Sequence, residues 1–257
     1  MKLSLEERLE KTLGAVSSCD ADRVLIDTCA FSLDAWNDGT FDPYFSWTKH
    51  GYPNQVPSPG NAAYDQHRVI DAAKTLLQET GAELPPLIYD EVCDYTSKIV
   101  RAHRTFRDTS RRQPQDIVLR ESVLYDQLEF QKEVSKRILT DVSPTDIHRK
   151  DVSRRLTDEE KEKWYSKADI DLVASAYAAK EEDESVAIIT RDYDIPYLCV
   201  HADKNSLGNT ATENINLVFI ADSFVGAGPV DSLVTYPKID SRMRKKFDRN
   251  HVHYSGY

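Results

Sequence analysis

The sequence predicts an α/β fold, with a central, mainly parallel sheet and helices packed on it. Two short apolar runs, Arg23–Asp27 and Val186–Thr190, have the length and residue types of buried parallel strands. Each run ends beside acidic side chains, and an alanine-rich segment with helical spacing precedes the second run. Binding sites in open α/β sheets lie outside the carboxyl ends of the strands. We therefore expect acids from distant parts of the chain to meet at one edge of the sheet.

The first part of the chain predicts three helices and one long loop. Leucines on one face indicate an amphipathic helix over Leu3–Val16, and a second helical segment, Cys29–Trp36, follows the first strand. A turn and cap sequence precedes a longer helix over Ala62–Glu79. Between these helices, residues 37–60 are rich in glycine, proline and aromatic side chains. This aromatic loop is either packed into the core or a platform on which single-stranded bases stack.

A helical insertion is expected over about residues 94–165. A strand-like pair at residues 87–88 leads into the helix that carries Asp90 and Glu91, and a long helix is expected over Gln115–Thr140. The first helix of the insertion carries a row of basic side chains: Lys98, Arg101, Arg104 and Arg107. This basic row is either a track for phosphates or a solvated face paired with nearby acids.

The second half of the chain supplies most of the expected acids. Apolar side chains recur at helical spacing from residue 170 onward, so Asp169 falls in the first turn of an amphipathic helix. Asp192 and Asp194 follow the second strand. Two further apolar runs, Pro196–Val200 and Ile215–Ile220, predict additional strands of the same sheet.

Composition sets the class of protein. A chain of 257 residues with 40% hydrophobic content can bury the core of one domain, which we place at residues 1–230. The net charge of −10 argues against a strongly basic nucleic-acid binder, although residues 231–257 form a basic tail. The four cysteines lack metal-ligand spacing, which favours reduced thiols in the cytoplasm. We expect no signal peptide, membrane span or membrane partner.

The predicted cluster of acids indicates a metal site. Two carboxylates ~4 Å apart repel by ~4 kcal/mol at an effective dielectric constant of about 20. Acids that converge from three or four segments therefore need either protons or divalent cations. Mg²⁺ and Mn²⁺ prefer oxygen ligands and retain several waters, so a few carboxylates suffice to hold them.

Four segments together resemble the PIN-domain family of metal-dependent ribonucleases. They are VLIDTCAF with Asp27, IYDEV with Glu91, DIDLVASAYA with Asp169, and ITRDYDI with Asp192 and Asp194. Small residues five and seven positions after the acid that opens the third segment are part of the family pattern. Alanines stand at both positions when the count starts from Asp169, which favours it over Asp171. The resemblance is loose from residue 23 to 92 and closer from 166 to about 222.

The resemblance implies a three-layer α/β/α fold and hydrolysis of RNA phosphodiester bonds with Mg²⁺ or Mn²⁺, leaving a 5′-phosphate. The implied metal-binding residues are Asp27, Glu91, Asp169 and Asp192, with Asp194 as a further catalytic acid. The expected substrate-binding residues are Lys98, Arg101, Arg104, Arg107, Thr28 and Thr190. RNA is the expected partner, and an inhibitory or targeting protein partner stays open.

Three alternatives to a single-strand endoribonuclease stay open. The fold could be a catalytically idle module that binds RNA or supports an assembly. The same phosphate chemistry would also serve a DNA nuclease, because nothing in the sequence indicates recognition of a 2′-hydroxyl. A phosphatase of the haloacid-dehalogenase type ranks last, since that family needs a second aspartate at the position of Cys29. The residues do not distinguish a toxin, a processing enzyme and a defence nuclease.

Overall fold

The computed structural model describes most of the sheet and its surrounding helices. The described residues are 3–31, 59–94, 97, 114–154, 156, 158, 165–201, 215–221 and 223–230. The aromatic loop up to residue 58, the basic row and the basic tail lie outside these residues, as do parts of the expected insertion. Of the helices in the described ranges, none is both long and apolar enough to cross a membrane.

The centre of the molecule is a four-stranded, mostly parallel sheet. Its strands follow the spatial order β1-β2-β3-β4. They are β1 (Arg23–Ile26), β2 (Val186–Thr190), β3 (Ile215–Ile220) and β4 (Val225–Pro229). The first three strands are parallel, and β4 runs antiparallel to β3. The α/β class and three of the four predicted strands are therefore confirmed, whereas the glycine-rich β4 was not predicted.

Two isolated parallel bridges extend the sheet beyond β1. Leu25 pairs with Glu83, and Leu84 pairs in turn with Ile138. The backbone amide of Glu83 donates to the carbonyl of Val24 at 2.8 Å. The segments around Glu83 and Ile138 therefore lie on one side of β1, and β2, which follows them in the chain, lies on the other side. This reversal makes the gap between the carboxyl ends of β1 and β2 the topological switch point, where ligands bind in open α/β sheets.

Two helices contact the sheet directly. α1 (Leu5–Cys19) contacts β2, β3 and β4, and it begins at a capping box in which Ser4 and Glu7 bond reciprocally. α9 (Lys167–Glu181) contacts β1 and β2. The expected helix at residues 3–16 is thus confirmed, with its end three residues further along. α9 is present as expected, but it is buried on nearly all sides rather than amphipathic, because α7 and α10 also pack against it.

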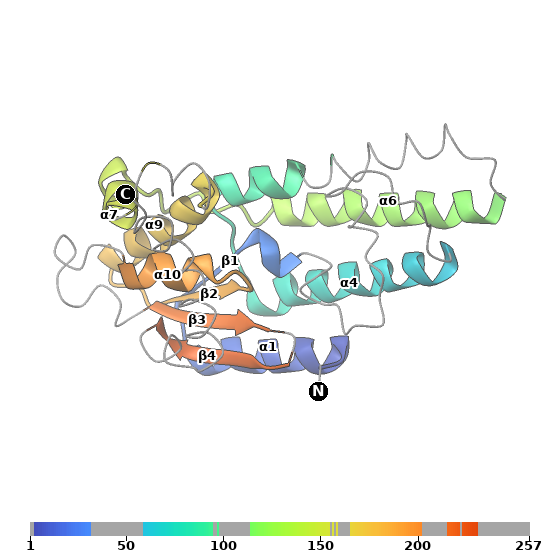
Figure 1. Ribbon diagram of the computed structural model, residues 1–257, viewed down its shortest axis with the longest axis horizontal. Helices are drawn as coiled ribbons and strands as arrows, with labels where there is room; N and C mark the ends of the chain where they lie inside the picture. Colours follow the sequence, from blue (N-terminus) through green and yellow to red (C-terminus); the bar gives the residue numbers. More distant parts are fainter. Residues whose placement is uncertain are drawn as a thin grey trace, which may run out of the picture.

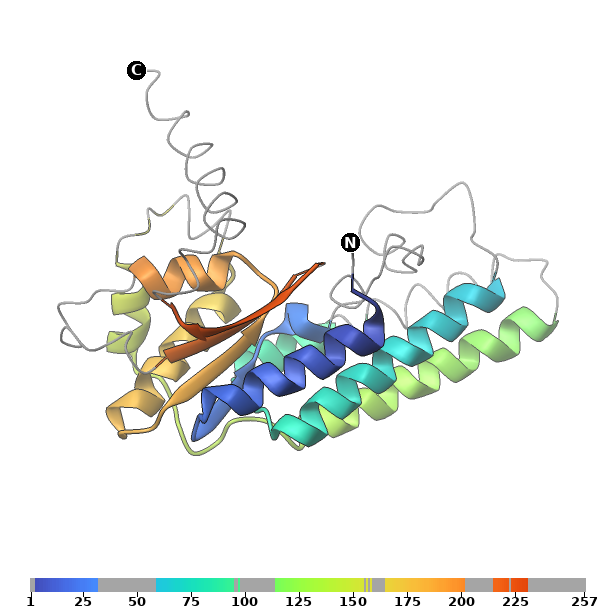
Figure 2. The same cartoon turned by 90° about the horizontal axis from the view of Figure 1, so that it is seen from below.

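A pair of long helices extends away from the sheet. α4 (Pro59–Thr80) and α6 (Pro114–Ser135) contact each other along their length, and two views at right angles show them side by side (Figures 1 and 2). The helix expected at residues 62–79 is confirmed. α6 stops before the expected Thr140, because the chain turns there and Ile138 joins the sheet.

Two short segments differ from their predictions. The expected strand Pro196–Val200 lies within α10 (Asp194–His201), where Ile195, Leu198 and Cys199 are buried at helical spacing. A short apolar run does not distinguish a buried helix from a strand, and proline is tolerated in a first helical turn. The strand-like pair at residues 87–88 lies in a helix over residues 86–94, and the sheet contact falls earlier, at Glu83 and Leu84.

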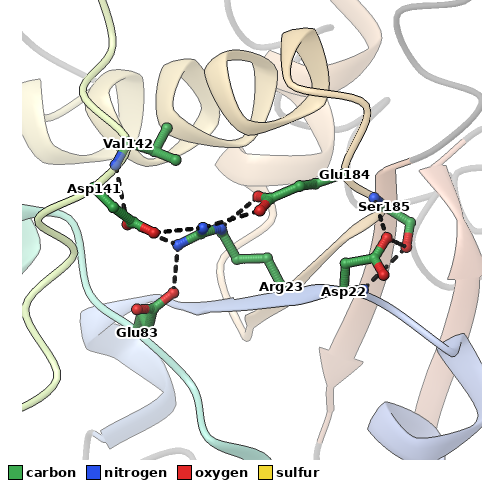
Figure 3. A network of polar contacts seen from close by, with 7 residues as sticks. All are labelled: Asp22, Arg23, Glu83, Asp141, Val142, Glu184 and Ser185. Atoms are coloured by element: carbon green, nitrogen blue, oxygen red, sulfur yellow. Dashed lines mark hydrogen bonds and ion pairs between the residues drawn. The ribbon is translucent and has the colours of Figure 1, made fainter.

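A charged network closes the amino edge of the sheet around Arg23, the first residue of β1 (Figure 3). The Arg23 guanidinium forms ion pairs with Glu83 at 2.7 Å, Asp141 at 2.9 Å and Glu184 at 2.6 Å. Nearby, the Ser185 amide and hydroxyl donate to the Asp22 carboxylate. The network ties β1 to the segment before the helix at 86–94, to the segment after α6 and to the segment before β2.

Candidate acidic site at the carboxyl edge of the sheet

Asp27 is the first acid of the candidate site and follows β1 directly. Its backbone amide donates to the carbonyl of Ile189 in β2 at 3.0 Å, which fixes the residue at the strand ends. The side chain is buried, with 3% of its surface exposed. Its Oδ2 accepts hydrogen bonds from the Thr190 hydroxyl at 2.7 Å and the Cys29 thiol at 2.6 Å. Asp27 is therefore a desolvated carboxylate whose hydrogen-bond partners here are neutral.

Asp169 enters the site from the first turn of α9. Its Oδ2 accepts from the Ser166 amide at 2.8 Å, while its own amide donates to the Ser166 hydroxyl at 3.0 Å. This capping box accounts for an acid at that position on structural grounds alone. It also fixes the carboxylate at the start of the helix, at the same edge of the sheet as Asp27.

The acids influence one another electrostatically. Burial raises the pKa of Asp27 to about 6, and the charge of Asp192 acts in the same direction, against lowering by the hydrogen bonds from Cys29 and Thr190. Burial also raises the pKa of Asp169 to about 7, to which the charges of Asp27 and Asp192 contribute. The charges of Asp27 and Asp192 therefore act on Asp169, although Asp27 lies more than 140 residues before Asp169 in the chain.

Asp192 and Asp194 lie in the turn between β2 and α10. The Asp192 amide donates to the Thr190 hydroxyl at 2.9 Å, and the Asp194 amide donates to Asp192 Oδ1 at 2.9 Å. Asp194 is the first residue of α10, where an acid is favoured by the helix dipole. The Thr190 hydroxyl thus bonds to both Asp27 and the Asp192 backbone, whereas its expected role in substrate binding stays a prediction.

Glu91 is held through Thr28. The Thr28 hydroxyl donates to Glu91 Oε2 at 2.9 Å, which joins η1 (Thr28–Phe31), a short 3-10 helix after β1, to the helix at residues 86–94. Only the first residues of the helix expected over 29–36 fall in the described range. The Glu91 carboxylate is therefore tied to the residue that follows Asp27.

Asp171, the alternative to Asp169, has a different environment. Its Oδ1 accepts from the Arg149 guanidinium at 2.8 Å, where α9 packs against α7 (Asp146–Ser153). Its side chain is almost fully buried in this ion pair. Asp171 thus neutralises Arg149 in a helix–helix contact, whereas Asp169 faces the other acids.

The acids supply the oxygen ligands that Mg²⁺ and Mn²⁺ prefer. Among the described residues, no group of three or more His, Cys, Asp or Glu side chains is close enough together to hold a metal ion. The charge of Asp192 nevertheless raises the pKa of Asp27, and the charges of Asp27 and Asp192 raise that of Asp169. The acids are therefore the right kind of ligand for such a cation, but the described side chains are not arranged as a metal site in this structure.

Cys29 lies near the site, as its position two residues after Asp27 indicates, but its bond to the Asp27 carboxylate was not predicted. Its sulfur donates to Asp27 and accepts from the backbone amide of Arg191 at 3.1 Å. Burial raises the pKa of the Cys29 thiol well above its ordinary value, and the charge of Asp27 adds to this shift. The 3-10 turn of η1 directs the thiol back to the sheet edge, and no spacing pattern in the sequence signals such a turn.

Comparison of the chain with protein-family models, curated proteins and solved structures found no match. The chemistry of the site is therefore argued from its own geometry and charges.

Proposed function

We propose that the protein is a Mg²⁺- or Mn²⁺-dependent endoribonuclease that cuts single-stranded RNA at this acidic edge. The observation that carries the proposal is that Asp27 and Asp169, beside the topological switch point, both have a raised carboxyl pKa and are both within the field of Asp192. Structural acids in the same molecule, such as Asp171, have an arginine partner. The resemblance to PIN-domain ribonucleases supports the same chemistry.

The proposal extends to a three-layer, PIN-like fold. α1 contacts β2, β3 and β4, whereas α9 contacts β1 and β2, so helices from both ends of the chain cover the sheet. The parallel bridges beyond β1 add the segments around residues 84 and 138 to the parallel part of the sheet. Both features support a helix–sheet–helix arrangement.

In this function Asp27, Asp169 and Asp192 hold the cation directly or through water. When bound, the ion lowers the pKa of a water and stabilises the leaving oxygen. A bound cation would favour the charged carboxylates of Asp27 and Asp169, so both would hold it in their deprotonated form. Glu91 and Asp194 orient the attacking water or complete a second metal position.

Cleavage of a labelled single-stranded RNA, beside a DNA of equal sequence, tests the proposal. The reactions contain Mg²⁺, Mn²⁺ or EDTA with wild type, Asp27→Asn and Asp183→Asn. Asp27→Asn keeps an acceptor for Thr190 and Cys29 but removes the charge. Asp183→Asn removes one charge from an exposed turn whose left-handed backbone asparagine also tolerates. We expect metal-dependent cutting of RNA by wild type and Asp183→Asn, and only background cutting by Asp27→Asn.

Cutting that survives in EDTA, or in Asp27→Asn, would contradict the proposed site. Equal cutting of the DNA would support metal-dependent phosphodiester hydrolysis but extend the substrate from RNA to DNA. Each variant is first compared with wild type by circular dichroism, so that a loss of activity is not confused with unfolding.

A second candidate is a catalytically idle module that binds RNA or supports an assembly. The described side chains contain no group of three or more His, Cys, Asp or Glu that could hold a metal ion, which favours this module. The capping role of Asp169 and the hydrogen bonds of Asp27 to uncharged side chains favour it too. This function predicts RNA binding that is unchanged by EDTA and by Asp27→Asn, with no cleavage under any condition.

A further inference from the structure

Lys167 is an exposed cation at the start of α9, where a positive charge is unfavourable. It is the first residue of the helix, beside the positive end of the helix dipole, which favours acids and disfavours lysine. Within the described part of the chain, no hydrogen bond or ion pair joins its ammonium group to another residue. Lys167 therefore works against the helix and has no internal partner that accounts for it, so its charge is available to an external anion.

A second cation lies on the same side of α9. Lys167 and Asp171 are four residues apart, so their side chains share one face of the helix. The Asp171 carboxylate accepts from Nε of Arg149, which extends from α7, at 2.8 Å. The Arg149 guanidinium is therefore held against the helical turn that carries Lys167.

Asp171 orients Arg149 without using all of its donors. The side chain of Asp171 is 3% exposed, whereas that of Arg149 is 42% exposed, so the carboxylate holds the guanidinium from the protein side. Nη1 makes one further, longer bond of 3.4 Å to the exposed Asp146. These bonds use two of the five N–H donors of the guanidinium. The other donors remain for an anion such as phosphate, which arginine binds through paired N–H groups.

The two cations and the acids lie on different sides of one helical turn. Asp169 stands between Lys167 and Asp171 in the sequence, and the charges of Asp27 and Asp192 act on its carboxylate. A helix with its side chains is about 10–12 Å across, so the cations lie within roughly that distance of the acids. Since the whole chain carries a net charge of −10, a polyanion needs local cations of this kind to approach the acidic edge.

We propose that Arg149 and Lys167 form a phosphate-binding patch that holds the backbone of a single-stranded RNA beside the acidic edge. This inference rests on the proposed RNA substrate, but it requires neither a bound cation nor cleavage. Arg149 supplies oriented N–H donors, and Lys167 supplies a charge that no acid compensates within the described part of the chain. Because the contacts are to phosphates, a DNA strand of equal sequence uses them too.

Binding of a labelled single-stranded RNA in EDTA tests the patch separately from cleavage. Fluorescence anisotropy gives the Kd at several salt concentrations for wild type, Lys167→Gln and the control Lys11→Gln, with a DNA of equal sequence alongside. Lys11 is an exposed lysine of α1 that also lacks a partner among the described residues, so both variants remove one unpaired charge. Thermal unfolding establishes that each variant is folded.

We expect Lys167→Gln to weaken RNA binding roughly 5–10-fold at 50 mM salt. The slope of log K against log salt should become shallower by about 0.7, the value for one phosphate contact of a single strand. The midpoint of thermal unfolding should stay at or above that of wild type, because the helix dipole no longer opposes a positive charge. Lys11→Gln should leave the Kd and the salt slope unchanged.

Two further proteins test Arg149. Arg149→Lys keeps a positive partner for Asp171 but loses the planar donors, so binding should weaken while the salt slope is retained. Arg149→Gln combined with Asp171→Asn removes both charges, which leaves no carboxylate buried alone, and should make the slope shallower as Lys167→Gln does. Arg68→Lys, which keeps a cation beside Glu6, is the control and should bind as wild type does.

An unchanged Kd and salt slope in folded Lys167→Gln would overturn the patch. An equal loss in Lys11→Gln would also overturn it, since binding would then respond to net charge alone. A loss for RNA but not for DNA would assign the contacts to the 2′-hydroxyl instead of phosphate.

The outcome is separable from that of the proposed nuclease. RNA binding that depends on Lys167, without cleavage by wild type in Mg²⁺ or Mn²⁺, would support the patch and reject the ribonuclease. Metal-dependent cleavage by a protein whose RNA binding is insensitive to Lys167 and Arg149 would do the reverse.

Discussion

Acidic side chains have opposite electrostatic environments at the two ends of β1. At the amino end, Glu83, Asp141 and Glu184 surround the guanidinium of Arg23 (Figure 3). At the carboxyl end, four residues further along, Asp27 bonds to a hydroxyl and a thiol and lies within the field of other acids.

The pKa shifts at the two ends have opposite signs. The hydrogen bond from Arg23 lowers the pKa of Asp141, whereas burial and like charge raise the pKa of Asp27 and Asp169. The amino edge is thus arranged for stability. The carboxyl edge keeps carboxylates whose repulsion works against the fold, which is typical of functional sites.

Removal of Arg23 has the largest expected effect on stability. Arg23→Ala leaves three acids together without their shared partner. Loss of one partner from a buried ion pair costs ~3–5 kcal/mol, and the partial exposure of these acids reduces the expected loss to about 3 kcal/mol. Urea unfolding at pH 7 measures the change. The control is Arg68→Ala, which breaks the exposed pair with Glu6 and costs at most about 1 kcal/mol.

A similar small loss in both arginine variants would show that the amino-edge network contributes no more than an ordinary surface pair. The contrast between the two ends of β1 would then rest on the carboxyl edge alone.

Asp27 and Asp169, at the carboxyl edge, are expected to contribute less to the free energy of unfolding as the pH rises. Both aspartates titrate near pH 3.9 in an unfolded chain, but at about 6 and about 7 here. Between about pH 4 and pH 7 the folded state therefore binds more protons than the unfolded state. Stability from these groups is full below about pH 4 and is lost as the pH rises through the folded values.

Asp27→Asn removes part of this pH dependence. In EDTA we expect the variant to be more stable than wild type by about 3 kcal/mol at pH 7.5, and by about half as much at pH 5. Urea unfolding at both pH values measures the difference, with Asp183→Asn as the charge-matched control. If the free energy of unfolding changed equally with pH in wild type and Asp27→Asn, burial and the neighbouring charge would not destabilise the Asp27 carboxylate.

The sequence predicts the sheet well where strands are buried on both faces. Strands of this kind are nearly continuous apolar runs, so β2 and β3 were located at their observed bounds. β4 contains two glycines and lies at the sheet edge, where its antiparallel pairing with β3 defines it rather than an apolar run. α10 was mistaken for a strand because a run of five apolar residues fits either structure.

The sequence predicts the acids of the site better than their partners. The carboxyl-edge rule predicted that Asp27 and Asp192 follow neighbouring parallel strands, and the structure has both at the carboxyl ends of β1 and β2. The bonds from Thr28 to Glu91 and from Cys29 to Asp27 depend on the short turn of η1. Such turns are set by tertiary contacts, which have no periodic signal in the sequence.

The smallest effect, at Ser166, separates the two roles of Asp169. Ser166→Ala removes the hydroxyl that caps α9, which should cost about 1 kcal/mol in urea unfolding. Ser4→Ala removes the equivalent hydroxyl of the α1 capping box and should cost a similar amount. Asp169 still accepts from the backbone amide at position 166, so we expect Ser166→Ala to retain the wild-type affinity for Mn²⁺. A loss of Mn²⁺ affinity would mean that the cap hydroxyl also orients the acid, so that helix stability and the site at this edge depend on one group.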